Sequence, residues 1–173
     1  MRRLLTFKHW HLFLLIFICG VWTSPSPLKE IINSLAIVTF SLWIYAIGVY
    51  GQERIAELGL QSMNVKLFKV NVIIVVTFLM VGLIFFSDIK STPSDTIELK
   101  DIPLIIGSLY LFFAIFQTII FVSKTIAKIE LKKEVSFGDY FTNLLLIFLF
   151  FIGVWILQTK VTKLIATNEI AAL

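Results

Sequence analysis

Five apolar runs separated by short polar segments dominate the chain. Each run is close to the length at which an α-helix, rising about 1.5 Å per residue, crosses ~30 Å of hydrocarbon. Lipid offers the backbone no hydrogen-bond partners, so such runs cross membranes as helices. The pattern therefore predicts an all-α, polytopic transmembrane helix bundle that forms one domain over residues 1–173. We expect about five spans, at residues 8–23, 29–50, 68–87, 103–123 and 139–158.

The first run, WHLFLLIFICGVW, also has the features of a secretory signal, because basic residues precede a short apolar stretch. However, Cys19 to Thr23 make a poor A-x-A-like cleavage site, and the residues before Cys19 form no lipobox. We therefore expect an uncleaved first span with the N-terminus in the cytoplasm. A cleaved signal peptide is the alternative.

The longest polar connection of the first half runs from Gly51 to Lys69. Its apolar residues are spaced loosely enough for a short amphipathic helix at the membrane interface, although Gly59 would weaken such a helix. Asn64 fits the N-cap of the following helix. We expect this connection to lie on the cytoplasmic side.

The last two runs are expected to form a hairpin around a polar connection that carries four lysines. A basic connection between two spans normally stays in the cytoplasm. We expect the fourth helix to continue past its apolar run to Glu134, because no helix breaker interrupts it. Ser136 and Asp139 then fit a capping box that starts the next helix. The lysines are Lys124, Lys128, Lys132 and Lys133.

The distribution of Lys and Arg favours the same orientation. With five spans and the N-terminus inside, the inner segments hold ten of these residues and the outer segments hold five. Without the first span the counts are eight and seven, which gives almost no bias. Lys160 and Lys163 fit less well, because they closely follow the last span and would prefer the inner side. A last segment that dips into the membrane and returns is therefore the alternative to a fifth span.

Composition agrees with a membrane location. Hydrophobic residues make up 58% of the chain and charged residues 15%, and the mean hydropathy is +0.95, values outside the range of soluble domains. The net charge of +4 comes from Lys and Arg beside apolar runs. Topology signals and contacts with lipid headgroups explain these charges better than nucleic-acid binding does. We expect the lipid bilayer, and no nucleic acid, among the partners.

Candidate chemistry is sparse. Away from the ends of the expected spans, no Asp, Glu, Lys or Arg lies inside an apolar run, which argues against proton relays and ion-coupled transport. The four carboxylates of the acidic segment 87–102 match no calcium loop. Metalloprotease, phosphate-loop and hydrolase motifs are absent from the sequence. We therefore expect no enzymatic activity, no cofactor and no metal site.

Three strings in the C-terminal third are SKT (residues 123–125), EVSFGD (134–139) and GVWILQ (153–158). In this order they resemble the ending of a recurrent family of small, uncharacterised bacterial multipass membrane proteins. The N-terminal string KHWHLFLLIF is similar too. The family ending often continues with Pro and Arg, whereas Thr159 and Lys160 stand here. The resemblance implies a multipass protein of the bacterial inner (cytoplasmic) membrane and brings no established activity.

Two functions fit these observations. In the first, the chain is a non-enzymatic membrane subunit or anchor that docks another protein through its basic cytoplasmic connections. In the second, copies self-associate into a homo-oligomeric pore or channel lined by a mildly polar stripe, as in small membrane effectors of bacterial antiviral defence. We prefer the first, because scattered Asn, Gln, Ser and Thr are ordinary contacts between membrane helices. The candidate docking residues are Lys124, Lys128, Lys132, Lys133 and Asp139, and the candidate pore residues are Asn33, Ser41, Gln117 and Asn143.

Overall fold

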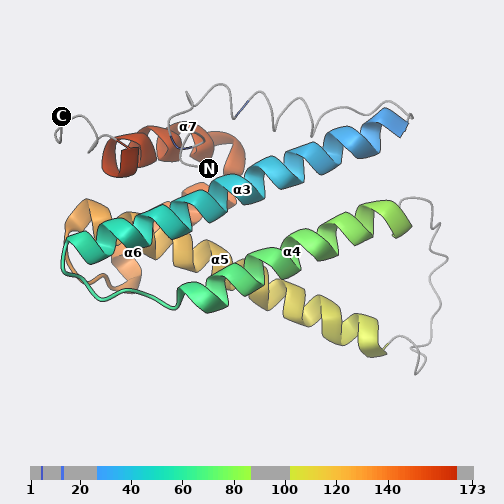
Figure 1. The fold of residues 1–173 in the computed structure, drawn as a ribbon, viewed down its shortest axis with the longest axis horizontal. Helices are drawn as coiled ribbons and strands as arrows, with labels where there is room; N and C mark the ends of the chain where they lie inside the picture. Colours follow the sequence, from blue (N-terminus) through green and yellow to red (C-terminus); the bar gives the residue numbers. More distant parts are fainter. Residues whose placement is uncertain (1–4, 6–12, 14–26, 87–101, 167–173) are drawn as a thin grey trace.

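Three long helices that each pack against the other two form the body of the protein (Figure 1). They are α3 (Pro27–Glu57), α4 (Val65–Phe86) and α5 (Ile102–Leu131). The computed structural model describes residues 5, 13, 27–86 and 102–166. All regular structure in these residues is helical, so the expected all-α fold is confirmed for them.

The three long helices are each long and apolar enough to cross a membrane. The shortest, α4, has 22 residues and extends about 33 Å. On α5, the large apolar side chains of Phe112, Phe113 and Phe116 are all more than 50% exposed. Lipid accommodates such an exposed apolar face, whereas water does not. The described helices therefore indicate a membrane protein. Apart from Phe13, the expected first span lies outside the described residues, as does the acidic segment up to residue 101.

The helix α3 is longer than the sequence predicted. Instead of a second, short interfacial helix after the span, α3 continues to Glu57 without a break. Gly59 then adopts a φ of 70°, and its N–H donates to the carbonyl of Ala56 at 3.0 Å. The N–H of Leu60 donates to the carbonyl of Ile55 at 3.1 Å. These two bonds form a Schellman motif, so Gly59 ends the helix rather than weakening its middle.

The start of α4 and the end of α5 follow the predictions more closely. Asn64 caps α4 as predicted, since its Oδ1 accepts a hydrogen bond from the N–H of Leu67 at 3.1 Å. As predicted, α5 continues past its apolar run, but it ends at Leu131, three residues early. Lys132 has a left-handed φ of 51°, and its N–H donates to the carbonyl of Lys128 at 2.9 Å. This single bond closes the last turn of α5.

The last apolar run forms two helices instead of the single span expected at residues 139–158. They are α6 (Phe137–Phe148) and α7 (Phe150–Val161). Each has 12 residues and so extends only about 18 Å. Leu149 separates them with a ψ of 53°, outside the helical region. A Cβ on Gly153 would lie 1.5 Å from the carbonyl oxygen of Leu146. The prediction of one continuous helix is therefore wrong, because the chain breaks where glycine lets two backbone segments touch.

An aromatic stack joins the three long helices. Phe68 of α4 is fully buried, and its ring stacks on Phe121 of α5 with the centroids 4.3 Å apart. On its α3 side lies Tyr45, with the centroids 6.4 Å apart. Gly48 makes room for this ring, because a Cβ there would lie 2.3 Å from the Cζ of Phe68. The stack therefore depends on one small residue in α3.

Two connections lie at the same end of the bundle (Figure 1). One joins α3 to α4 over residues 58–64, and the other joins α5 to α6 over residues 132–136. We call this the connection end. Both connections are basic or are flanked by basic residues. The two segments that the sequence predicts on the same side of the membrane therefore lie at the same end of the bundle.

Candidate functional site

A lysine is buried at the connection end. The side chain of Lys128 is only 7% exposed, and its ammonium forms an ion pair with Glu134 at 2.6 Å. The same ammonium donates to the backbone carbonyl of Gln61 at 2.8 Å. Glu134 in turn accepts a hydrogen bond from the N–H of Gln61 at 3.1 Å. A buried charge is tolerated when it is paired and hydrogen-bonded. Lys128 therefore ties α5 to both connections.

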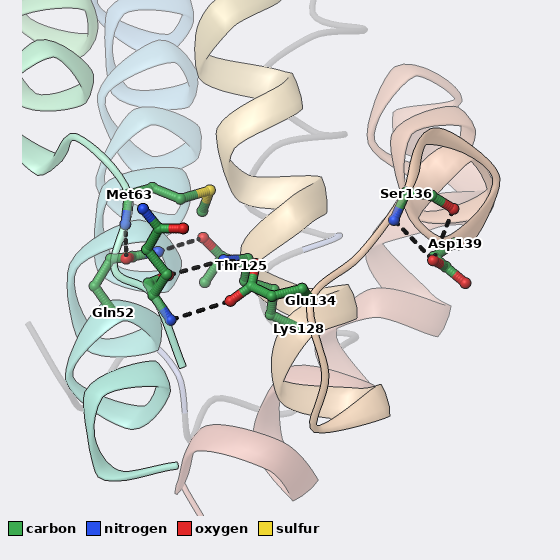
Figure 2. A network of polar contacts seen from close by, with 8 residues as sticks. Gln52, Met63, Thr125, Lys128, Glu134, Ser136 and Asp139 are labelled. Atoms are coloured by element: carbon green, nitrogen blue, oxygen red, sulfur yellow. Dashed lines mark hydrogen bonds and ion pairs between the residues drawn. The ribbon is translucent and has the colours of Figure 1, made fainter. Parts of the chain in front are cut away.

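Gln52 of α3 makes a second link at this end (Figure 2). Its Nε2 donates to Oγ1 of Thr125 at 3.0 Å, and its Oε1 accepts from the N–H of Met63 at 2.9 Å. Figure 2 shows the side chains of Gln52, Thr125 and Lys128 meeting between the helices. We call the whole group the connection network: Gln52, Gln61, Met63, Thr125, Lys128 and Glu134.

Ser136 and Asp139 form the capping box that the sequence predicted at the start of α6. The Asp139 carboxylate accepts hydrogen bonds from the backbone N–H and the hydroxyl of Ser136, at 2.8 and 2.9 Å. These bonds, helped by the Lys133 ammonium at 3.4 Å, lower the pKa of Asp139 below its usual value. The hydrogen bond from Lys128 likewise lowers the pKa of Glu134. Asp139 therefore serves α6 as a charged cap.

The predicted docking lysines have different surroundings. Lys128 belongs to the connection network, and Lys124 is half-buried with its ammonium 5.2 Å from the ring centroid of Tyr140, a cation–π distance. Lys132 and Lys133 are exposed and adjoin each other where α5 ends. Of the four lysines, these two are therefore the most exposed.

Large apolar side chains flank the two exposed lysines. Leu131 is 43% exposed and Phe137 is 61% exposed, so apolar and positive groups share this part of the surface. The structure thus combines two kinds of contact within one short segment. We call this surface the basic edge: Leu131, Lys132, Lys133 and Phe137.

The residues of the predicted polar stripe lie in different surroundings. Asn33 is half-buried near the start of α3, and Ser41 lines a cavity of about 180 Å³ between the long helices. Gln117 accepts a hydrogen bond from Nδ2 of the fully buried Asn71 at 3.0 Å. Asn143 is buried in α6, and its Oδ1 has no hydrogen-bond partner in the structure as described. No hydrogen bond given by the described residues joins any two of the four.

Gln158 of α7 is a junction that the sequence patterns did not single out, although it ends the string GVWILQ. Its Oε1 accepts from the indole N–H of Trp43 at 2.7 Å, and its Nε2 donates to the carbonyl of Leu5 at 3.1 Å. Two residues later, Lys160 forms an ion pair at 2.9 Å with Glu130, in the last turn of α5. The end of α7 therefore lies beside the end of α5, next to the segment from which α6 starts.

The described polar residues form structural contacts and an exposed surface. Across the described ranges, no group of three or more His, Cys, Asp or Glu side chains gathers that could hold a metal ion. No family model, curated protein or solved structure matches the chain. The resemblance of its C-terminal third to small bacterial membrane proteins stays a prediction.

Proposed function

We propose that the chain is a non-enzymatic membrane subunit or anchor that holds a partner protein at its basic edge, on the cytoplasmic side of a bacterial inner membrane. The observation that carries this proposal is an exposed basic and apolar surface on a fixed support. A surface that is already ordered before binding loses less entropy when a partner docks. The basic edge meets this requirement.

The support holds the basic edge from both sides. Lys128 precedes it and pairs with Glu134 inside the same segment, and both bond Gln61 of the α3–α4 connection. After it, the bonds from Ser136 to Asp139 fix the start of α6. A partner that presents acidic side chains around a large apolar one would match its two lysines, its leucine and its phenylalanine.

The proposal assigns the connection end to the cytoplasm, with four complete spans that include the expected first one. The ion pair between Lys160 and Glu130 supports a pair of helices, α6 and α7, that enters the membrane from this side and returns to it. Lys160 and Lys163 then lie inside. The Lys and Arg distribution changes from ten against five to twelve against three, a stronger positive-inside bias.

A pore made of identical copies has weaker support. Gln117 already uses its side-chain oxygen within one chain, in the contact with Asn71. Asn143 is only 2% exposed within one chain. The acceptor of Gln117 and the buried Asn143 are therefore engaged within one chain, and we keep the pore only as an outcome of the test.

The proposal can be tested by gentle detergent extraction from native membranes followed by native mass spectrometry. The wild-type chain should carry a stoichiometric foreign protein, and the double variant Lys132→Glu with Lys133→Glu should lose it. Lys66→Glu with Lys163→Glu is the matched control, because it makes the same charge change at exposed lysines elsewhere. A ring of identical wild-type chains without a foreign protein, or equal loss in both double variants, would overturn the proposal.

A further inference from the structure

A groove runs along the outside of the bundle where the start of α4 meets α5. Its volume is about 360 Å³. Phe113 and Phe116 in its wall are 53% and 51% exposed, so the groove opens on the apolar flank of the bundle. The lining residues used below are Asn64, Phe113, Phe116, Ile120 and Lys124.

The groove changes from apolar to polar along its length. Phe113, Phe116, Ile120 and Lys124 recur at spacings of three or four residues, so they share one face of α5. The helix rises about 16 Å from the first to the last of them. Lys124 is nearest the connection end, and the phenylalanines lie farther from that end along α5. A phospholipid has the same order of groups, with a charged headgroup above apolar chains.

Lys124 brings an unneutralised positive charge to the groove. Lys128, Lys133 and Lys160 each have a carboxylate partner. Within the described residues Lys124 has none in ion-pair range, and its ammonium lies over the ring of Tyr140. Asn64 spends its side-chain oxygen on capping α4, which leaves its amide nitrogen as a donor. Lys124 and Asn64 both line the groove, so it has a positive charge and a free amide donor in its wall.

We propose that the groove binds one anionic phospholipid, with the phosphate at Lys124 and Asn64 and an acyl chain along Phe113, Phe116 and Ile120. Basic pockets between membrane helices on the cytoplasmic side recognise anionic headgroups in this way. A zwitterionic headgroup carries its own cation and gains less from the charge of Lys124. The shared chemistry is a phosphate group, and the apolar wall makes the lipid, rather than free phosphate, its source.

Native mass spectrometry in mixed micelles tests the site, with phosphatidylglycerol and phosphatidylcholine as probes. The wild-type chain should retain phosphatidylglycerol preferentially. Lys124→Gln should reduce this preference about fivefold, since a lysine near an anionic headgroup contributes roughly that factor. Lys124→Arg keeps the charge and should keep the preference. Lys133→Gln, which removes a lysine outside the groove, should keep it too.

Two further measurements distinguish binding of the whole lipid from binding of a phosphate group alone. Phe116→Ala should weaken retention of phosphatidylglycerol, because it shortens the apolar wall, while inorganic phosphate should not displace the lipid. Full displacement by inorganic phosphate, no wild-type preference, or an equal effect of Lys124→Gln and Lys133→Gln would overturn the proposal. None of these readouts needs a partner protein, so the lipid site and the docking function can fail separately.

Discussion

The bundle of α3, α4 and α5 and the pair α6–α7 are built from similar apolar runs but fold differently. α5 continues for 30 residues, whereas the last run divides into two helices of 12. Each region contains a glycine at a close contact. Gly48 lies against the ring of Phe68, and its helix α3 is continuous. Gly153 lies against the backbone carbonyl of Leu146, and the helix is broken between them at Leu149. Apolar length shows that a segment can span, but it does not show whether its helix is continuous.

The two regions also use polar groups differently. In the bundle, polar contacts join its own helices: the connection network ties loops and helix ends together, and the buried Asn71 of α4 bonds Gln117 of α5. In the pair, Gln158 is 1% exposed and reaches both α3 and the N-terminal Leu5. The pair is therefore held to the rest of the molecule by specific polar contacts as well as by packing.

Gly153→Ala should have the largest effect on stability. The new Cβ would meet the backbone oxygen of Leu146 at 1.5 Å, and a backbone atom cannot rotate away as a side chain can. We expect the free energy of unfolding to fall by about 3 kcal/mol, measured by denaturant titration of circular dichroism in micelles. Gly82→Ala is the control, because nothing lies within 4 Å of its added Cβ. Similar losses at both glycines would contradict the break.

Gly48→Ala should be the next most damaging change. The methyl group would displace the buried ring of Phe68, at a cost of about 2 kcal/mol. Combining it with Phe68→Leu, which removes the ring, should make the two effects non-additive by more than about 0.5 kcal/mol. The same titration measures both variants. Strict additivity would show that the ring does not rest on Gly48.

Gln158→Leu should loosen the pair and leave the bundle intact. It removes the acceptor of the Trp43 indole N–H, and we expect a loss of about 1 kcal/mol. Hydrogen exchange read by mass spectrometry should show that the variant exchanges faster than the wild type in α7, with a smaller change in α4. Thr159→Val is a matched control, because Thr159 bonds only within its helix turn, to the carbonyl of Trp155. Equal changes in α4 and α7 would contradict this division.

Acidification should have the smallest effect, confined to the connection end. The folded state lowers the pKa values of Glu134 and Asp139. Their contribution is therefore full above the carboxyl pKa values of the unfolded chain, about 4, and disappears as pH falls through the lower values of the folded state. Hydrogen exchange corrected for intrinsic rates should show loosening at residues 132–139. Glu134→Gln with Asp139→Asn should show it already at pH 7, and unchanged protection there would contradict the assignment.

Local signals in the sequence predicted much of the fold. The cap at Asn64 and the capping box of Ser136 and Asp139 involve residues three apart, so the pattern alone identifies them. Gly59 was recognised as unfavourable inside a helix, but its role as the stop of α3 depends on the length of that helix. Local patterns thus predict the helical character of the described chain and several helix ends.

The contacts between distant residues were not predictable in this way. Gln52 and Thr125 are 73 residues apart, and Trp43 and Gln158 are 115 apart. Lys128 is one of the predicted docking residues, and no local pattern shows that Glu134 and Gln61 hold its ammonium. The break at Leu149 was not predicted for the same reason. Hydropathy gives no information on the close contact between Gly153 and the carbonyl of Leu146.

The most direct test of the returning α6–α7 pair is cysteine labelling in sealed membrane vesicles. In a Cys19→Ser background, Ser62→Cys marks the α3–α4 connection. Lys163→Cys marks the short π-helix Thr162–Ala166 that follows α7, and both positions are exposed. A membrane-impermeant maleimide is applied to right-side-out and to inverted vesicles. We predict that both cysteines react from the same side, in inverted vesicles. Labelling of the two from opposite sides would contradict the returning pair and restore a fifth span.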